Sequence, residues 1–173
     1  QQEFEGGIHG ELVARGEVDA PTCTHCHGEH GILAISDPRS PVSPFRVAEA
    51  TCTPCHESAN LNDKYDLPSG RLQSYVDSYH GLKSRAGDKT VANCASCHGA
   101  HAILPSSDPR SSVAAANLIT TCGHCHTGMS PEKAAKTQIH AAVGGHRTGV
   151  AYVVKIVYQV LIFLIIGGMA AYC

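Results

Sequence analysis

The chain has 173 residues and a formal charge of −2, lacks tryptophan, and contains only 5 % aromatic residues. So few aromatic side chains are too little for an ordinary hydrophobic core, and small domains of this kind usually depend on covalent links or cofactors. The near-neutral charge and the lack of a basic cluster argue against a nucleic-acid-binding protein.

In chain order, the first recurring feature is the motif Cys-x-x-Cys-His, which occurs four times between residues 23 and 126. This is the attachment site of a c-type haem, in which the adjacent histidine ligates the iron. Zinc sites and disulfide frameworks also use closely spaced cysteines, but neither explains a histidine after every second cysteine. We therefore predict four covalently bound haem c groups. The predicted thioether cysteines are Cys23, Cys26, Cys52, Cys55, Cys94, Cys97, Cys122 and Cys125, and the predicted proximal iron ligands are His27, His56, His98 and His126.

The motifs belong to an internal repeat. Residues 23–40 and 94–111 match at twelve of eighteen positions, and a His-Gly pair precedes each stretch at the same distance. Such self-similarity indicates a duplicated structural unit. We therefore predict a first dihaem unit at residues 1–64, a second at 65–147 that includes a connecting helix, and a transmembrane helix at 148–173.

Further histidines are candidates for the second axial ligand of each iron. His9, His30, His80 and His101 recur with the repeat, and His140 is a fifth candidate for four places. His30 and His101 follow their proximal histidines by three residues and so share one helical face with them. We therefore expect both to reach neighbouring haems, and His9 and His80 to serve their own units. Ligation by histidine alone predicts low reduction potentials.

The shared segment "SDPRS" follows the first motif of each unit. Its Asp-Pro step is typical of a turn, because proline fixes φ and aspartate accepts hydrogen bonds from nearby backbone. Arg39 and Arg110 in this segment could pair with haem propionates, or could be solvated. Two helices are also expected, one at about 70–79 that delivers His80, and one that begins at Pro131.

The last part of the chain, from Val150, is almost entirely apolar. Its 24 residues would form a helix of about 36 Å, longer than the roughly 30 Å hydrocarbon core of a membrane. A buried helix of a soluble core is the alternative, but the preceding sequence offers no large apolar surface to cover it. We predict a single membrane span in contact with lipid. The haem-bearing part is expected on the periplasmic or other extracytoplasmic side, where haem c is attached.

The order His-Gly, CxxCHGxH, SDPRS and CxxCH, repeated once before a membrane helix, resembles the periplasmic multihaem c-type cytochromes with doubled CxxCH motifs. Some members of that family continue into a cytochrome-b-like membrane domain. The resemblance covers nearly all of the chain and implies bis-histidine haems that pass electrons. It also implies quinone-linked membrane redox subunits and soluble or outer cytochromes as partners.

The predicted fold is therefore mainly α with much irregular loop, with a haem-cored tetrahaem module and one transmembrane helix. The predicted function is electron relay by a membrane-anchored tetrahaem cytochrome, a non-catalytic subunit of a respiratory or photosynthetic oxidoreductase complex. Two alternatives stay open: an enzyme with one open haem acting on a small nitrogen or sulfur compound, and a cytochrome that polymerises into a filament.

Overall fold

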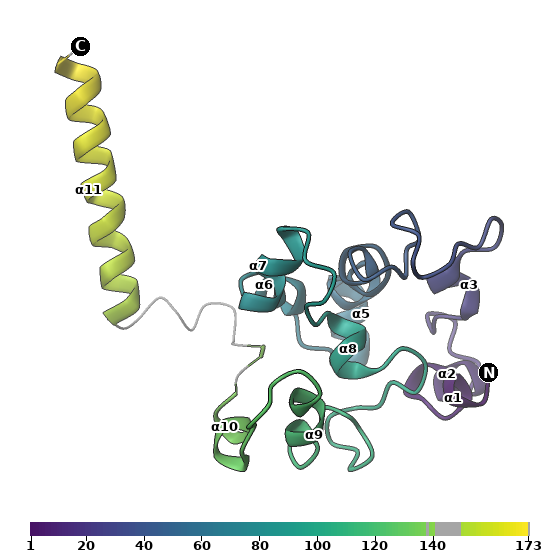
Figure 1. Ribbon diagram of the computed structural model, residues 1–173. Helices are drawn as coiled ribbons and strands as arrows, with labels where there is room; N and C mark the ends of the chain where they lie inside the picture. Colours follow the sequence, from purple (N-terminus) through teal and green to yellow (C-terminus); the bar gives the residue numbers. More distant parts are fainter. Residues whose placement is uncertain (138, 141–149, 173) are drawn as a thin grey trace. The chain divides into compact units, whose positions relative to one another are not determined.

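The computed structural model describes residues 1–137, 139–140 and 150–172, which are mainly helical and contain no strand (Figure 1). The chain divides into two compact units, residues 1–140 and 141–173, which are described separately. The helices of the first unit are α1 (Gln2–Glu5), α2 (Ile8–Ala14), α3 (Cys23–His27), the π-helical segment η1 (Val47–Cys52), α4 (Thr53–His56), α5 (Ala59–Tyr65), α6 (Arg71–Val76), α7 (Tyr79–Arg85), α8 (Cys94–His98), α9 (Leu118–Gly123) and α10 (Pro131–Lys136).

The first unit contains very little apolar core, as its composition predicted. Among the described residues the buried apolar side chains are small, and Tyr75 is the largest of them. Alanine and valine provide the rest: Ala20, Val47, Ala48, Ala114 and Ala134. Side chains of this size bury too little area to stabilise a unit of this length by hydrophobic packing alone.

The repeat seen in the sequence is also present in the fold, as two helical hairpins. Helix α1 packs against α2, and α6 packs against α7 (Figure 1). In each hairpin a glycine, Gly10 or Gly81, lies directly against the carbonyl of an aromatic residue, Phe4 or Tyr75. A side chain on either glycine would collide with that backbone. The His-Gly pairs of the sequence therefore serve the packing of the hairpins.

The connecting helix is shorter than the sequence indicated. We expected one helix over about 70–79, but α6 ends at Val76 and α7 begins at Tyr79. Ser78 is the N-cap of α7, and its hydroxyl accepts a hydrogen bond from the Gly81 amide at 3.2 Å. This cap turns the chain, so that His80 lies in the first turn of α7 rather than after the end of α6.

The first Cys-x-x-Cys-His motif of each repeat forms a short helix with a reciprocal cap. At α8, Asn93 accepts from the Ser96 amide, and the Ser96 hydroxyl accepts from the Asn93 amide, both at 3.1 Å. At α3 the same role is taken by Thr22 and His25, whose Nδ1 accepts from the Thr22 amide at 3.1 Å. His25 is exposed and serves this helix start. These caps hold the five motif residues in a single helical turn.

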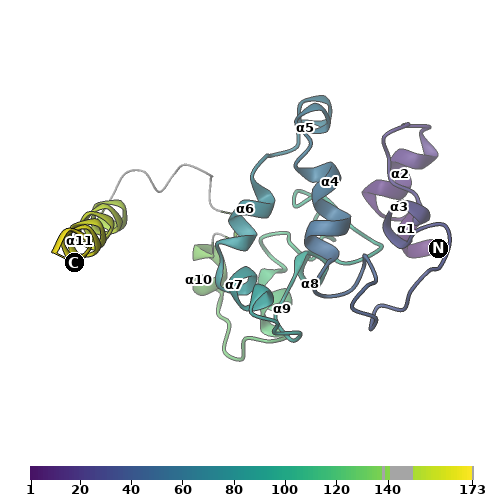
Figure 2. The same ribbon diagram turned by 90° about the horizontal axis from the view of Figure 1, so that it is seen from above.

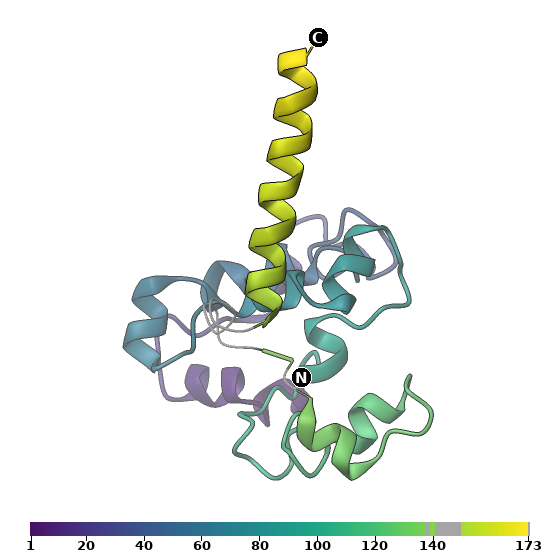
Figure 3. The ribbon, with the colours of Figure 1, turned by 90° about the vertical axis from the view of Figure 1, so that its left-hand side faces the viewer.

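The two halves of the first unit meet at η1 and α8, which pack together. Figure 2 shows α4, which continues directly from η1, on the same side of the unit as α8. The Asn93 side chain adds a hydrogen bond to the Pro44 carbonyl at 3.4 Å. The contact between η1 and α8 brings the second and third motifs together. Helices α9 and α10 also pack against each other (Figure 3).

The second unit contains one long helix, α11 (Val150–Tyr172), shown in Figure 3. Its segment Tyr152–Ala170 has a mean hydropathy of 2.2, and none of that segment is buried against other parts of the protein. Length and composition make it a candidate membrane span. The predicted boundary at residue 147 lies outside the described residues, as does Cys173.

Candidate functional site

Each of the four motif histidines faces one histidine from elsewhere in the chain. The paired rings come from parts of the sequence that are far apart, so the fold of the first unit brings them together. The pairs, with the distances between ring centres, are His9–His56 (6.2 Å), His27–His101 (6.1 Å), His80–His126 (5.9 Å) and His98–His140 (6.2 Å).

This spacing has the width needed for a metal ion between two rings. A metal–imidazole bond of about 2 Å, with the nitrogen about 1 Å from the ring centre, places two axial imidazoles roughly 6 Å apart. Among the described residues, no cluster of three or more histidine, cysteine, aspartate or glutamate side chains could by itself hold a metal ion. Each pair could instead supply two ligands to an iron that a porphyrin already holds.

The pairing follows the repeat for two of the four sites. His9 faces His56, the second motif histidine of its own repeat, and His80 faces His126 in the same way. His101 instead faces His27 of the other repeat, and not His98 three residues before it. The His27–His101 pair therefore joins the two repeats directly.

The fourth site uses a histidine outside the repeat. His140 faces His98, and its Nδ1 lies 2.8 Å from the Ser74 hydroxyl on α6. That hydroxyl also donates to the Arg71 carbonyl at 2.9 Å, so its only proton is used there. The Ser74 oxygen must then accept from Nδ1–H of His140. This leaves the Nε2 lone pair of His140 free to bind a metal.

His30 is the fifth predicted distal ligand, and it is in none of these four pairs. It is exposed and lies in the loop after α3, at the position that matches His101 in the repeat. His101 faces a motif histidine of the other repeat, whereas His30 has no such partner among the described residues.

The motif thiols also show how neighbouring sites connect. The Cys52 and Cys94 thiols, from the second and third motifs, lie close enough for each to shift the pKa of the other. The neighbouring Cys94 thiol, together with burial, raises the pKa of Cys52. All eight motif cysteines are free of disulfides. Groups attached at Cys52 and Cys94 would therefore be direct neighbours where the two repeats meet.

Burial keeps several of the paired imidazoles neutral. The pKa values of His9, His56 and His98 are all lowered, first by loss of solvent around the ring. The pKa values of His80 and His140 are lowered for the same leading reason. A neutral imidazole keeps a lone pair on one nitrogen, and this is the form that binds metal ions.

The two repeated arginines are engaged by their own turns. Arg39 donates to both carboxylate oxygens of Asp37, at 3.1 and 2.8 Å, and Asp37 also accepts from the Arg39 amide. Arg110 and Asp108 repeat this arrangement at nearly the same distances. The sequence suggested haem propionates or solvent as the partners of these arginines, whereas here aspartate two residues earlier takes that place.

Two other charged residues near the sites were not singled out from the sequence. Glu57, directly after His56, accepts from the backbone amides of Gly70 and Leu72 at 3.0 and 2.7 Å, and so fixes the start of α6. The Arg71 guanidinium, in the first turn of α6, lowers the pKa values of both His98 and His140 by its positive charge. The signal for Arg71 is a positive charge close to a histidine pair, and this can be recognised only once the fold is known.

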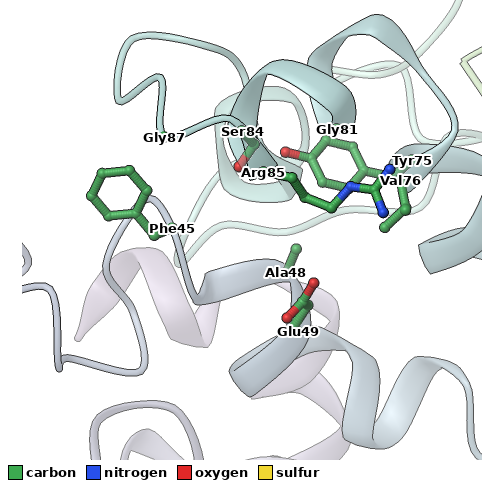
Figure 4. A pocket seen from close by; sticks show the side chains of 9 residues that line it. All are labelled: Phe45, Ala48, Glu49, Tyr75, Val76, Gly81, Ser84, Arg85 and Gly87. Atoms are coloured by element: carbon green, nitrogen blue, oxygen red, sulfur yellow. The ribbon is translucent and has the colours of Figure 1, made fainter.

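One cavity lies apart from the histidine pairs. Figure 4 shows it between the segment that begins η1 and the hairpin of α6 and α7, with Phe45, Glu49, Tyr75 and Arg85 in its walls. Its volume is ≈ 470 Å³, and no motif cysteine or histidine lines it. The four facing pairs, rather than this cavity, are therefore the candidate functional site.

Comparison with known proteins gave no match: no family model, curated protein or solved structure corresponds to this chain.

Proposed function

We propose that this chain is a membrane-anchored tetrahaem cytochrome c. The observation that supports it is the pairing of every Cys-x-x-Cys-His histidine with one further histidine at 5.9–6.2 Å. A zinc or disulfide protein has no use for four facing pairs of this width next to four pairs of cysteines. The resemblance to multihaem cytochromes with doubled CxxCH motifs points to the same function.

The chain's own residues would do three things in such a protein. The eight cysteines would hold the porphyrins covalently, and the paired histidines would occupy both axial positions of each iron. Bound haem supplies the one-electron chemistry, which the protein itself does not perform. Because the two histidines of each pair would both hold the iron, the sites favour electron relay over binding of a substrate.

The packing of the motifs supports a continuous path for electrons. The Cys52–Cys94 contact joins the second and third motifs, and His101 joins the second repeat to the first motif. The thiol of Cys26 lies close enough to Cys55 for a charge on one to raise the pKa of the other. The attached groups would therefore follow one another without a large gap through the first three motifs.

The apolar helix α11 supports attachment to a membrane. We place the haem-bearing unit on the extracytoplasmic side, because covalent haem c is attached there. The partners we propose are a quinone-linked membrane redox subunit on one side and periplasmic or extracellular cytochromes on the other.

The mass and the spin state of the purified full-length protein test this proposal. We expect the mass of the polypeptide plus four haem groups, and a spectrum of low-spin haem that does not change when carbon monoxide is added to the reduced protein. A bare polypeptide mass would refute the cytochrome itself. Carbon monoxide uptake at one haem would instead favour the enzyme alternative, with one open axial position.

A further inference from the structure

The four facing pairs differ in the charges behind their distal histidines. At the His27–His101 pair, Nδ1 of His101 lies 3.7 Å from a Glu3 carboxylate oxygen. At the His98–His140 pair, the neutral Ser74 hydroxyl accepts from Nδ1 of His140, and the Arg71 backbone and guanidinium are close by. One distal histidine thus has a negative neighbour, and the other has a neutral and a positive one.

These neighbours act on the side of the ring away from the metal. In both cases Nδ1 faces the neighbour, so Nε2 is the nitrogen available to the iron. A carboxylate beside Nδ1–H makes the imidazole a stronger electron donor and stabilises the extra positive charge of ferric iron. A nearby guanidinium does the opposite and favours ferrous iron, because like charges repel. Hydrogen bonds and charges around axial ligands are known levers on haem potential.

We propose that Glu3 lowers the reduction potential of the His27–His101 site, and that Ser74 and Arg71 leave the His98–His140 site with a higher one. This inference rests on the proposed function, since it needs haem at both pairs. With haem bound at both pairs, this difference would favour electron transfer from the first site to the second. No bond forms or breaks, and one iron is oxidised as the other is reduced.

Exposure limits the size of this difference but leaves its sign unchanged. The Glu3 side chain is 77 % exposed, and that of His101 is 52 % exposed, so water and salt screen part of the interaction. Ser74, in contrast, is only partly exposed and bridges Arg71 and His140 inside the unit. The effect at His101 should therefore weaken as salt is added, and the effect at His140 should change less.

Redox titration of the full-length, haem-loaded protein in detergent tests the inference with two opposite variants. Glu3→Gln removes the carboxylate, and we expect the lowest of the four midpoint potentials to rise. Ser74→Asp places a carboxylate beside His140, and we expect one of the higher midpoints to fall. Glu5→Gln on the same helix and Gln73→Asp on α6 change charge by the same amounts at exposed positions, and should leave the order of the four midpoints unchanged.

The outcomes separate this inference from the proposed function. If all four haems are present and low-spin but Glu3→Gln shifts no midpoint more than Glu5→Gln does, the inference is wrong and the cytochrome stands. A fall of the lowest midpoint in Glu3→Gln would also overturn it. If Ser74→Asp does not incorporate haem, Arg71→Gln gives the same test, because loss of the positive charge should also lower that midpoint. A protein without haem would end both proposals.

Discussion

His27 and His101 face each other with their ring centres 6.1 Å apart and their planes inclined by 22°. They come from equivalent regions of the two repeats: His27 belongs to the first motif of one repeat, and His101 follows the first motif of the other. The pair is therefore a connection between the two repeats, and it depends on how they pack together.

Substitution of His101 should open one of the four proposed haem sites. In His101→Ala we expect one haem in four to become high-spin and to bind carbon monoxide when reduced, because its iron loses an axial ligand. Absorption and electron paramagnetic resonance spectra of the purified protein measure this. His30→Ala is the matched control, since His30 occupies the same repeat position without a described partner ring, and it should leave all four haems low-spin. High-spin haem in His30→Ala would refute the pairing.

Gly7 is required for the docking that presents His101. A Cβ at Gly7 would lie 2.8 Å from the His101 carbonyl oxygen and 2.9 Å from the Ile103 amide, and the next amide, of Ile8, donates to the Ile103 carbonyl at 2.8 Å. Gly7→Ala should therefore destabilise the protein by about 1–3 kcal/mol, as overpacked contacts do. Thermal unfolding monitored by haem absorption would show it.

Gly6→Ala is the control for this prediction. A Cβ at Gly6 would meet the Gln2 carbonyl oxygen at 3.5 Å, an ordinary contact, so its unfolding temperature should change little. Equal losses of stability in the two variants would mean that helix propensity or chain flexibility, and not docking on residues 101–103, explains the effect of Gly7→Ala.

The helical turns at the first Cys-x-x-Cys-His motif of each repeat could be predicted from the sequence because they depend on neighbouring residues. Residues 23–27 and 94–98 each form one capped turn, and the spacing alone implies this. The turn at Asp37 was likewise readable, since aspartate beside proline commonly accepts hydrogen bonds from the following backbone. The apolar span of α11 needed only length and composition. In each case the determining interactions are local.

The pairing of the distal histidines was not readable in full, because it depends on contacts between distant segments. His30 and His101 lie in nearly identical local sequences, yet of the two only His101 faces a motif histidine of the other repeat within the described part of the chain. The repeat also departs from symmetry where Ser78 replaces the glycine that Gly7 provides in the first hairpin. At Gly7 a serine side chain would collide with the backbone of residues 101–103. The second hairpin, which has Ser78 at this position, therefore cannot make the backbone contact that Gly7 makes.

Asp37 should make the stability of the first unit depend on pH in the acid range. Its hydrogen bonds from Arg39 lower its pKa from the model-compound value of 3.8 to about 2. A lowered folded-state pKa means that the stabilisation is present above pH 4 and is lost as the pH falls towards 2. Asp37→Asn should reduce the loss of unfolding temperature between these pH values.

Asp63→Asn is the control for Asp37, because it removes an exposed carboxylate on α5 without disturbing the Asp–Arg turn. Its melting temperature should follow that of the unmodified protein from pH 4 to pH 2. If Asp37→Asn and the unmodified protein lose stability equally over that range, the Asp37–Arg39 pair does not contribute to the acid dependence.

Removal of α11 should release a haem-loaded protein from the membrane. All eight motif cysteines and all four histidine pairs lie within residues 1–140, which form a compact unit without it. A chain that ends after residue 149 should therefore appear in the soluble fraction with four haems, whereas the full chain should stay in the membrane pellet after alkaline extraction. Cell fractionation with haem staining measures both.

A single substitution tests the same helix without deletion. Leu161→Arg places a charge in the middle of the apolar segment, where insertion costs about 2.5–3.5 kcal/mol, and should reduce the fraction extracted only by detergent. Lys155→Arg keeps the existing charge near the start of α11 and should have no effect. A truncated protein that stays with the membrane, or a Leu161→Arg protein retained as well as the original, would show that residues of the first unit, and not α11, attach the chain to the membrane.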